Sequence, residues 1–120
     1  MTMQPTVPAI TAREAADEVA AGQALIVDVR ERSEFEQERA AGVALLPVSE
    51  FVARHAELPK DRPLLMLCAA GSRSASATMY LLQAGWTDVR NVTGGMHAWR
   101  QAGLPVLSGP AAPGEGAIPG

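Results

Sequence analysis

Cysteine is almost absent from this chain of 120 residues, which contains Cys68 and no other. A single cysteine excludes a disulfide within the chain, a Cys-x-x-Cys redox pair and a zinc site made of several cysteines. Any chemistry at Cys68 must therefore proceed without a second thiol from the same chain. We expect neither a bound metal nor a cofactor.

Long apolar runs and basic runs are also missing. The longest apolar stretch, Leu64 to Ala70, is far too short to cross a bilayer, and residues 1–10 lack the basic and apolar regions of a signal peptide. We therefore expect a cytoplasmic protein with no membrane partner. The net charge of -3, without a basic cluster, argues against nucleic acid as a partner.

The composition predicts one globular domain. Hydrophobic residues make up 48% of the chain and charged residues 19%, which is ordinary for a folded protein. We expect an N-terminal extension at residues 1–8, a domain at 9–106 and a tail at 107–120. The tail is rich in Gly, Pro and Ala without periodicity, which predicts disorder.

Strands and helices are expected to alternate along the domain. A helix over residues 11–21 has Thr11 and Glu14 as a capping box and Gly22 as its stop, while the apolar runs 25–29 and 64–68 predict buried strands. Further helices are expected at 33–39, 49–55 (with Ser49 as N-cap), 74–84 and 96–102, and further strands at 43–46 and 89–92. This order predicts an α/β fold, in which a small parallel sheet is flanked by helices on both faces. Functional loops then follow the carboxyl ends of the strands.

Cys68 stands at such a strand end, and the loop from Cys68 to Ser74 leads to the N-terminus of an expected helix. Unpaired backbone amides and the positive end of the helix dipole accumulate there and favour an anion. A free cysteine has a pKa of about 8.5, so about 3% is thiolate at neutral pH, and lowering the pKa by roughly two units raises this to about 75%. We expect Cys68 to be a catalytic nucleophile. The alternative is an inert core residue, because free cysteines are among the most buried residue types.

The six residues after Cys68 are the expected substrate-binding set. Ala69, Ala70 and Gly71 are small enough for their amides to turn toward the sulfur, and Gly71 is suited to a positive φ. Ser72 and Ser74 are expected to cap the helix or to donate to the ligand, and Arg73 to hold an anionic donor.

Asp28 and Arg30 are the expected supporting residues at the end of the other buried strand. Asp28 has three open roles: accepting hydrogen bonds from the loop, pairing with an arginine, or simply capping the strand end. Arg30 either lines the donor path or is a solvated surface residue.

Motifs along most of the chain resemble one known family. They are Asp28-Val29-Arg30, Glu34-Phe35, Gly42, Pro47, the loop Cys68 to Ser74, Gly85-Trp86, Gly94-Gly95 and Trp99. In this order and spacing they resemble the rhodanese domain over residues 9–106. The resemblance implies a sulfurtransferase that moves a sulfane sulfur from a donor such as thiosulfate to a thiophilic acceptor such as cyanide or a thiol. It also implies a ping-pong mechanism through a Cys68 persulfide.

One segment departs from the family pattern. Where rhodanese domains often have Gly-His-Ile before a glycine, this chain has Glu38-Arg39-Ala40. The departure leaves the cysteine loop intact. It therefore bears on the selection of a substrate or of a protein sulfur acceptor more than on the chemistry.

Two other functions stay open from the sequence. One is a sulfur carrier or binding module for a protein partner. The other is a cysteine-dependent phosphatase or arsenate reductase, which resembles this site but uses Cys-x5-Arg. This chain has Cys68-x4-Arg73, one residue fewer, which predicts a cradle too tight for a tetrahedral oxyanion.

Overall fold

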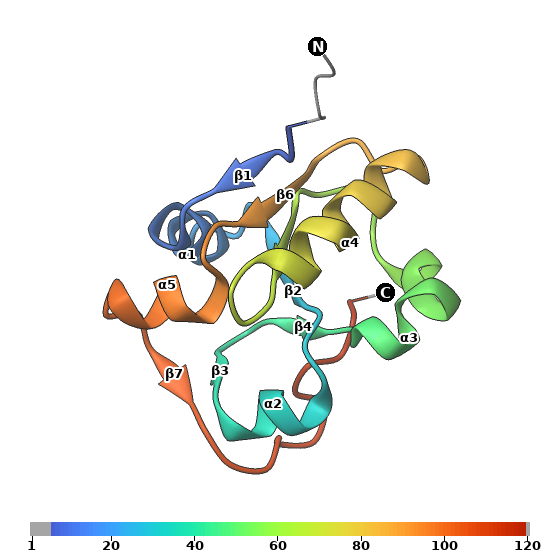
Figure 1. Cartoon of the computed structure of the whole chain (residues 1–120). Coiled ribbons are helices and arrows are strands. Elements are labelled where there is room, and N and C mark those ends of the chain that lie inside the picture. Colours follow the sequence, from blue (N-terminus) through green and yellow to red (C-terminus); the bar gives the residue numbers. More distant parts are fainter. Residues whose placement is uncertain (1–5, 120) are drawn as a thin grey trace.

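The computed structural model describes residues 6–119, and strands and helices alternate through most of this length (Figure 1). The strands are β1 (Ala9–Ile10), β2 (Leu25–Asp28), β3 (Arg39–Ala40), β4 (Ala44–Leu45), β5 (Leu64–Leu67), β6 (Val89–Val92) and β7 (Val106–Leu107). The helices are α1 (Ala12–Ala20), α2 (Arg32–Gln37), α3 (Val48–Arg54), the short 3-10 helix η1 (His55–Glu57), α4 (Ser72–Gln83) and α5 (Gly95–Gln101).

Five strands form the central sheet, in the order β1-β6-β5-β2-β4, and every neighbouring pair is parallel. The two apolar runs of the sequence become β2 and β5, which pair in the middle of the sheet with Asp28 opposite Leu67. The carboxyl ends of these strands therefore meet at one edge, with the Cys68 loop directly beyond it. This confirms the predicted α/β architecture.

Helices cover both faces of the sheet, as predicted (Figure 1). On one face the buried residues Phe51 of α3 and Leu81 of α4 join a core cluster with Val27 and Met66. On the other face Phe35 of α2, Ala15 of α1 and Trp99 of α5 join a second cluster with Ile26 and Leu65. Each central strand is buried on both sides, which explains its unbroken apolar sequence.

Local signals marked one helix start correctly and another wrongly. The Thr11 side chain accepts from the Glu14 amide, and Glu14 returns a bond to the Thr11 amide, which is the predicted capping box. Helix α3 instead begins at Val48 with Pro47 as its N-cap, so Ser49 lies inside the first turn. The Ser49 hydroxyl donates to Glu31 at 2.8 Å, and the prediction that it caps the helix is wrong.

The C-terminal segment is ordered against the domain, which corrects the expectation of a disordered tail. The Gly116 carbonyl accepts from the Leu45 amide at 2.7 Å, so the segment covers the exposed edge of β4. The carboxylate of Glu115 pairs with the buried guanidinium of Arg39, and Ile118 packs against the core. These contacts come from single residues, which explains why the tail shows no periodic pattern in the sequence.

The expected N-terminal extension lies largely outside the described residues, which begin at residue 6. Within that extension the carbonyl of Pro8 accepts from the Asn91 amide at 2.8 Å, just before β1. Across residues 6–119, no helix combines the length and the apolar character needed to span a bilayer.

Candidate active site

The cysteine loop occupies the short connection between β5 and α4. Cys68 directly follows β5 and is 1% exposed, whereas Ala70 and Ser72 are exposed. Gly71 is the N-cap of α4 with φ of 109°, the positive value that the sequence predicted. The helix has no side-chain cap, so the expectation that Ser72 or Ser74 caps it is wrong: Ser72 is its first residue, and the Ser74 side chain turns toward the sulfur.

Two residues surround the Cys68 sulfur with hydrogen-bond donors. The amide of Gly71 lies 3.1 Å from Sγ and the amide of Ser74 lies 3.4 Å from it. The Ser74 hydroxyl lies 3.2 Å from Sγ. The loop thus forms the inward-facing cradle of amides that its small residues predicted.

These donors set the charge preference of the sulfur. Burial raises the pKa of the Cys68 thiol, but hydrogen bonds from the Ser74 hydroxyl and from the amides of Ser74, Gly71 and Ala70 lower it by more. The net effect is a pKa below the ordinary cysteine value. The cradle is therefore suited to a thiolate nucleophile.

Helix α5 holds the loop from the other side. Its Met96 amide donates to the Cys68 carbonyl at 2.8 Å, and the His97 amide donates to the Ala69 carbonyl at 3.1 Å. This close approach requires glycine at position 95, because a Cβ there would lie 2.3 Å from the Cys68 carbonyl oxygen. The Gly94-Gly95 pair therefore brings the α5 backbone onto the active loop.

Arg73 forms a two-pronged ion pair with Glu34 of α2. The two guanidinium nitrogens lie 2.7 and 2.9 Å from the two carboxylate oxygens. The hydrogen bond to Glu34 is the main cause that raises the pKa of Arg73, and the charge of Cys68 adds to the rise. Glu34 appeared among the family-like motifs of the sequence, but nothing in the sequence joined it to the loop.

Asp28 and Arg30 form a buried pair at the end of β2. The Arg30 Nη2 lies 2.8 Å from Asp28 Oδ2, and the side chains are 6% and 0% exposed. Arg30 also donates to the carbonyls of Glu34 and Glu38 at 3.3 and 2.7 Å. Two of the roles left open for Asp28 are observed: it pairs with an arginine, and its Oδ1 accepts from the Arg30 amide at 3.0 Å and so caps the strand end. The alternative of a solvated Arg30 is wrong, because its side chain is buried. Its bonds to the carbonyls of Glu34 and Glu38 anchor the helix that carries Glu34.

Asn91 of β6 also belongs to the site, and sequence reasoning missed it. Its Oδ1 accepts from the Ser74 hydroxyl at 2.6 Å, and its Nδ2 donates to the Gly71 carbonyl at 3.2 Å. The only signal in the sequence was a polar side chain inside a short strand. That signal could not show that β6 lies next to β5 in the sheet.

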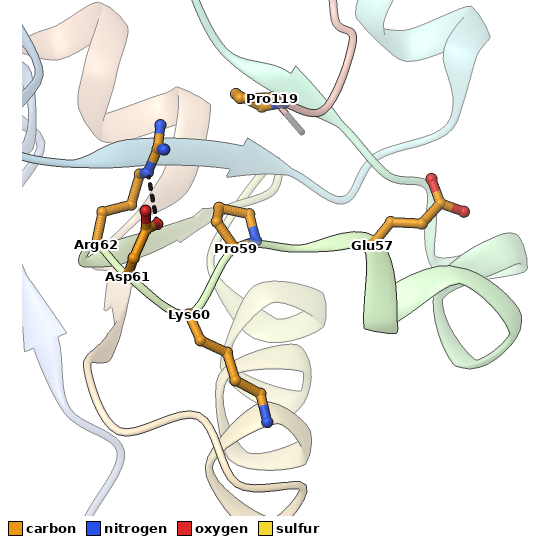
Figure 2. Close-up of a pocket in the computed structure, with 6 residues that line it drawn as sticks. All are labelled: Glu57, Pro59, Lys60, Asp61, Arg62 and Pro119. Atoms are coloured by element: carbon orange, nitrogen blue, oxygen red, sulfur yellow. Dashed lines mark hydrogen bonds and ion pairs between the residues drawn. The ribbon is translucent and has the colours of Figure 1, made fainter.

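A pocket of about 360 Å³ lies elsewhere on the molecule (Figure 2). It is lined by Pro119 of the C-terminal segment and by residues of η1 and the loop before β5, namely Glu57, Pro59, Lys60, Asp61 and Arg62. This loop enters the amino end of β5, whereas Cys68 follows the carboxyl end. The pocket therefore lies apart from the cysteine site. Among residues 6–119 no cluster of histidine, cysteine and carboxylate side chains has the form of a metal site.

Comparison with known proteins gives concordant matches. The family described as the rhodanese-like domain matches residues 11–102. A sulfurtransferase from Allochromatium vinosum is 38% identical over 84 residues, which cover 70% of this chain and 78% of that protein. The thiosulfate sulfurtransferase GlpE of Vibrio cholerae is 33% identical over 84 residues, covering 70% and 79%. The crystal structure of a rhodanese-related protein from Thermoplasma volcanium superposes with a TM-score of 0.77 at 30% identity, covering 83% and 97%.

Proposed function

The chain belongs to the rhodanese-like domain family and is a sulfurtransferase of the rhodanese type, and on that premise we propose that Cys68 carries the transferred sulfur as a persulfide. The observation that supports this role is the cradle around Sγ, in which the amides of Gly71 and Ser74 and the Ser74 hydroxyl all point at one sulfur. A persulfide anion added to Cys68 needs such donors, because its charge must be stabilised in a partly buried loop.

The proposed reaction has two halves. In the first, the Cys68 thiolate attacks the outer sulfur of thiosulfate, a new S–S bond forms, and the old S–S bond breaks with its electron pair leaving on sulfite. In the second, cyanide or a thiol attacks the outer sulfur of the persulfide, and the electron pair returns to Cys68 as the thiolate. No general base is invoked, because the hydrogen bonds that lower the pKa of Cys68 favour the thiolate, which is the form that attacks.

Arg73 is proposed to attract the anionic donor through its positive charge. Its guanidinium has five N–H donors, and the pair with Glu34 uses only part of them. Glu34 also fixes the direction of the guanidinium through its two hydrogen bonds. Ala69, Ala70 and Ser72 complete the proposed substrate-binding set through their backbone and small side chains.

The proposal is tested by intact mass spectrometry on the whole chain. Treatment with thiosulfate should add the mass of one sulfur atom, and subsequent cyanide should remove it. The matched control is Cys68→Ser, which keeps the size of the side chain and should take up no sulfur. Turnover by Cys68→Ser would contradict the mechanism. Sulfur uptake without turnover by small acceptors would instead indicate a carrier that serves a protein partner.

A further inference from the structure

Asn91 is held rigidly beside the active loop. Its backbone lies in β6, with Ala9 of β1 and Met66 of β5 as its register partners on the two sides. Its amide donates to the Pro8 carbonyl at 2.8 Å. The side chain therefore extends from a fixed backbone toward Ser74 and Gly71.

The hydrogen bonds also fix which way the Asn91 amide group faces. Its Nδ2 donates to the Gly71 carbonyl, so its Oδ1 must face the Ser74 hydroxyl. The reversed orientation would place two acceptor oxygens against each other at Gly71. Asn91 consequently presents Ser74 with an acceptor and never with a donor.

Ser74 has one hydroxyl proton and two acceptors within reach. Asn91 Oδ1 lies 2.6 Å from Ser74 Oγ, and Cys68 Sγ lies 3.2 Å from it. A neutral thiol is a weak acceptor, whereas an amide oxygen at this distance is a good one. With the thiol protonated, the hydroxyl proton therefore belongs to Asn91, and the Ser74 oxygen is free to accept from the thiol S–H.

Loss of the thiol proton reverses this preference. The thiolate has no proton to donate and is a charged acceptor, so it competes for the Ser74 hydroxyl proton. We propose that Asn91 is a positioning residue that holds the Ser74 proton away from Cys68 while the sulfur is a thiol and yields it when the sulfur is an anion. The inference deepens the proposed function, because the thiolate is the species that attacks the donor.

The charged groups around the loop are separately paired. They are Arg73 with Glu34, Arg30 with Asp28, Arg90 with Glu18, and Arg100 of α5 with Glu38. None of these pairs includes Ser74 or Asn91. Substitution at either position therefore leaves the charges that face Cys68 in place.

The test measures the pKa of Cys68 through the pH dependence of its alkylation by iodoacetamide, which needs no sulfur donor. Asn91→Ala should lower this pKa by roughly half a pH unit, because Ser74 no longer has a competing acceptor. Ser74→Ala should raise it by a similar amount through loss of a donor. The double variant should match Ser74→Ala, because Asn91 acts through Ser74.

A purely structural role for Asn91 predicts a different pattern. If it only braces Gly71, Asn91→Ala should raise the pKa of Cys68 whether or not Ser74 is present, and that result would overturn the proposal. Asn91→Asp, which preserves size, covers the case in which Asn91→Ala fails to fold. The aspartate is a stronger acceptor for the Ser74 proton, so Asn91→Asp should raise the pKa of Cys68 more in the protein that retains Ser74 than in the Ser74→Ala variant. Equal rises in the two proteins would also contradict the role. Failure of sulfur transfer would leave these alkylation results unchanged, so the two proposals fail separately.

Discussion

Arg73 and Glu34 lie 39 positions apart in the sequence and form two parallel hydrogen bonds of 2.7 and 2.9 Å. The pair joins the first turn of α4, which follows the cysteine loop, to α2. Glu34 is itself held from behind, because Arg30 donates to its carbonyl and binds Asp28. Hydrogen bonds thus connect Asp28 at the end of β2, through Arg30 and Glu34, to Arg73 of α4.

The Arg73–Glu34 pair should make stability depend on acidity. The hydrogen bond from Arg73 is the main cause that lowers the pKa of Glu34 from 4.5 to about 2. Because the folded-state pKa is the lower one, the stabilisation is complete above about 4.5 and is lost as the pH falls toward 2. Glu34→Gln should lower the Tm by about 2–5 °C at neutral pH, with the difference shrinking below pH 4.5. Thermal melts of both proteins across this range provide the check, and a constant difference would contradict the pairing.

Gly95 should tolerate no side chain. In Gly95→Ala the added Cβ would meet the Cys68 carbonyl oxygen at 2.3 Å and the Ala69 carbonyl carbon at 2.8 Å, both of which are backbone atoms. We expect a loss of about 2 kcal/mol or more in the free energy of unfolding, together with slower alkylation of Cys68. The matched control is Gly103→Ala, which shares a positive φ but has open space around its Cβ. It should cost about 1 kcal/mol from backbone strain alone. Urea unfolding of both variants measures the difference. Equal losses in the free energy of unfolding would show that the close approach of Gly95 to the cysteine loop contributes nothing to stability.

Deleting residues 112–120 should destabilise the domain. The deletion removes Glu115 from Arg39 and the Gly116 carbonyl from the Leu45 amide, and it uncovers the edge of β4. Lost packing, an unpaired Leu45 amide and the loss of the carboxylate beside the buried Arg39 predict a fall in Tm of about 5–10 °C. Glu115→Gln, which keeps the backbone contact, should show a smaller fall. An unchanged Tm after deletion would mean that the segment contributes nothing to stability.

Loop length should separate sulfur transfer from phosphate chemistry. The cradle from Cys68 to Arg73 is one residue shorter than a Cys-x5-Arg loop, and its amides already converge on Sγ at 3.1 and 3.4 Å. The native chain should therefore show thiosulfate sulfurtransferase activity and no significant hydrolysis of an aryl phosphate. Insertion of one glycine after Gly71 should lower sulfur transfer and permit weak binding of phosphate. Assays of both reactions on both proteins decide this, and efficient phosphatase turnover by the native chain would overturn it.

The sequence by itself determined the order of most strands and helices and the nature of the cysteine loop. Both depend on interactions among residues a few positions apart: the Thr11–Glu14 capping box, the apolar runs of β2 and β5, and a helix N-terminus directly after Cys68. The positive φ of Gly71 was also predictable from the sequence, because the backbone conformation of a glycine is a local property.

Only the tertiary structure decided which distant groups serve that loop. Asn91 reaches Ser74 because β6 pairs with β5, and Arg73 meets Glu34 because α2 and α4 converge beyond the sheet edge. The burial of Arg30 and the docking of Glu115 on Arg39 likewise depend on contacts across long stretches of chain. Such pairs leave no periodic trace in the sequence, since each requires only one correctly placed side chain once the sheet has brought its neighbours together.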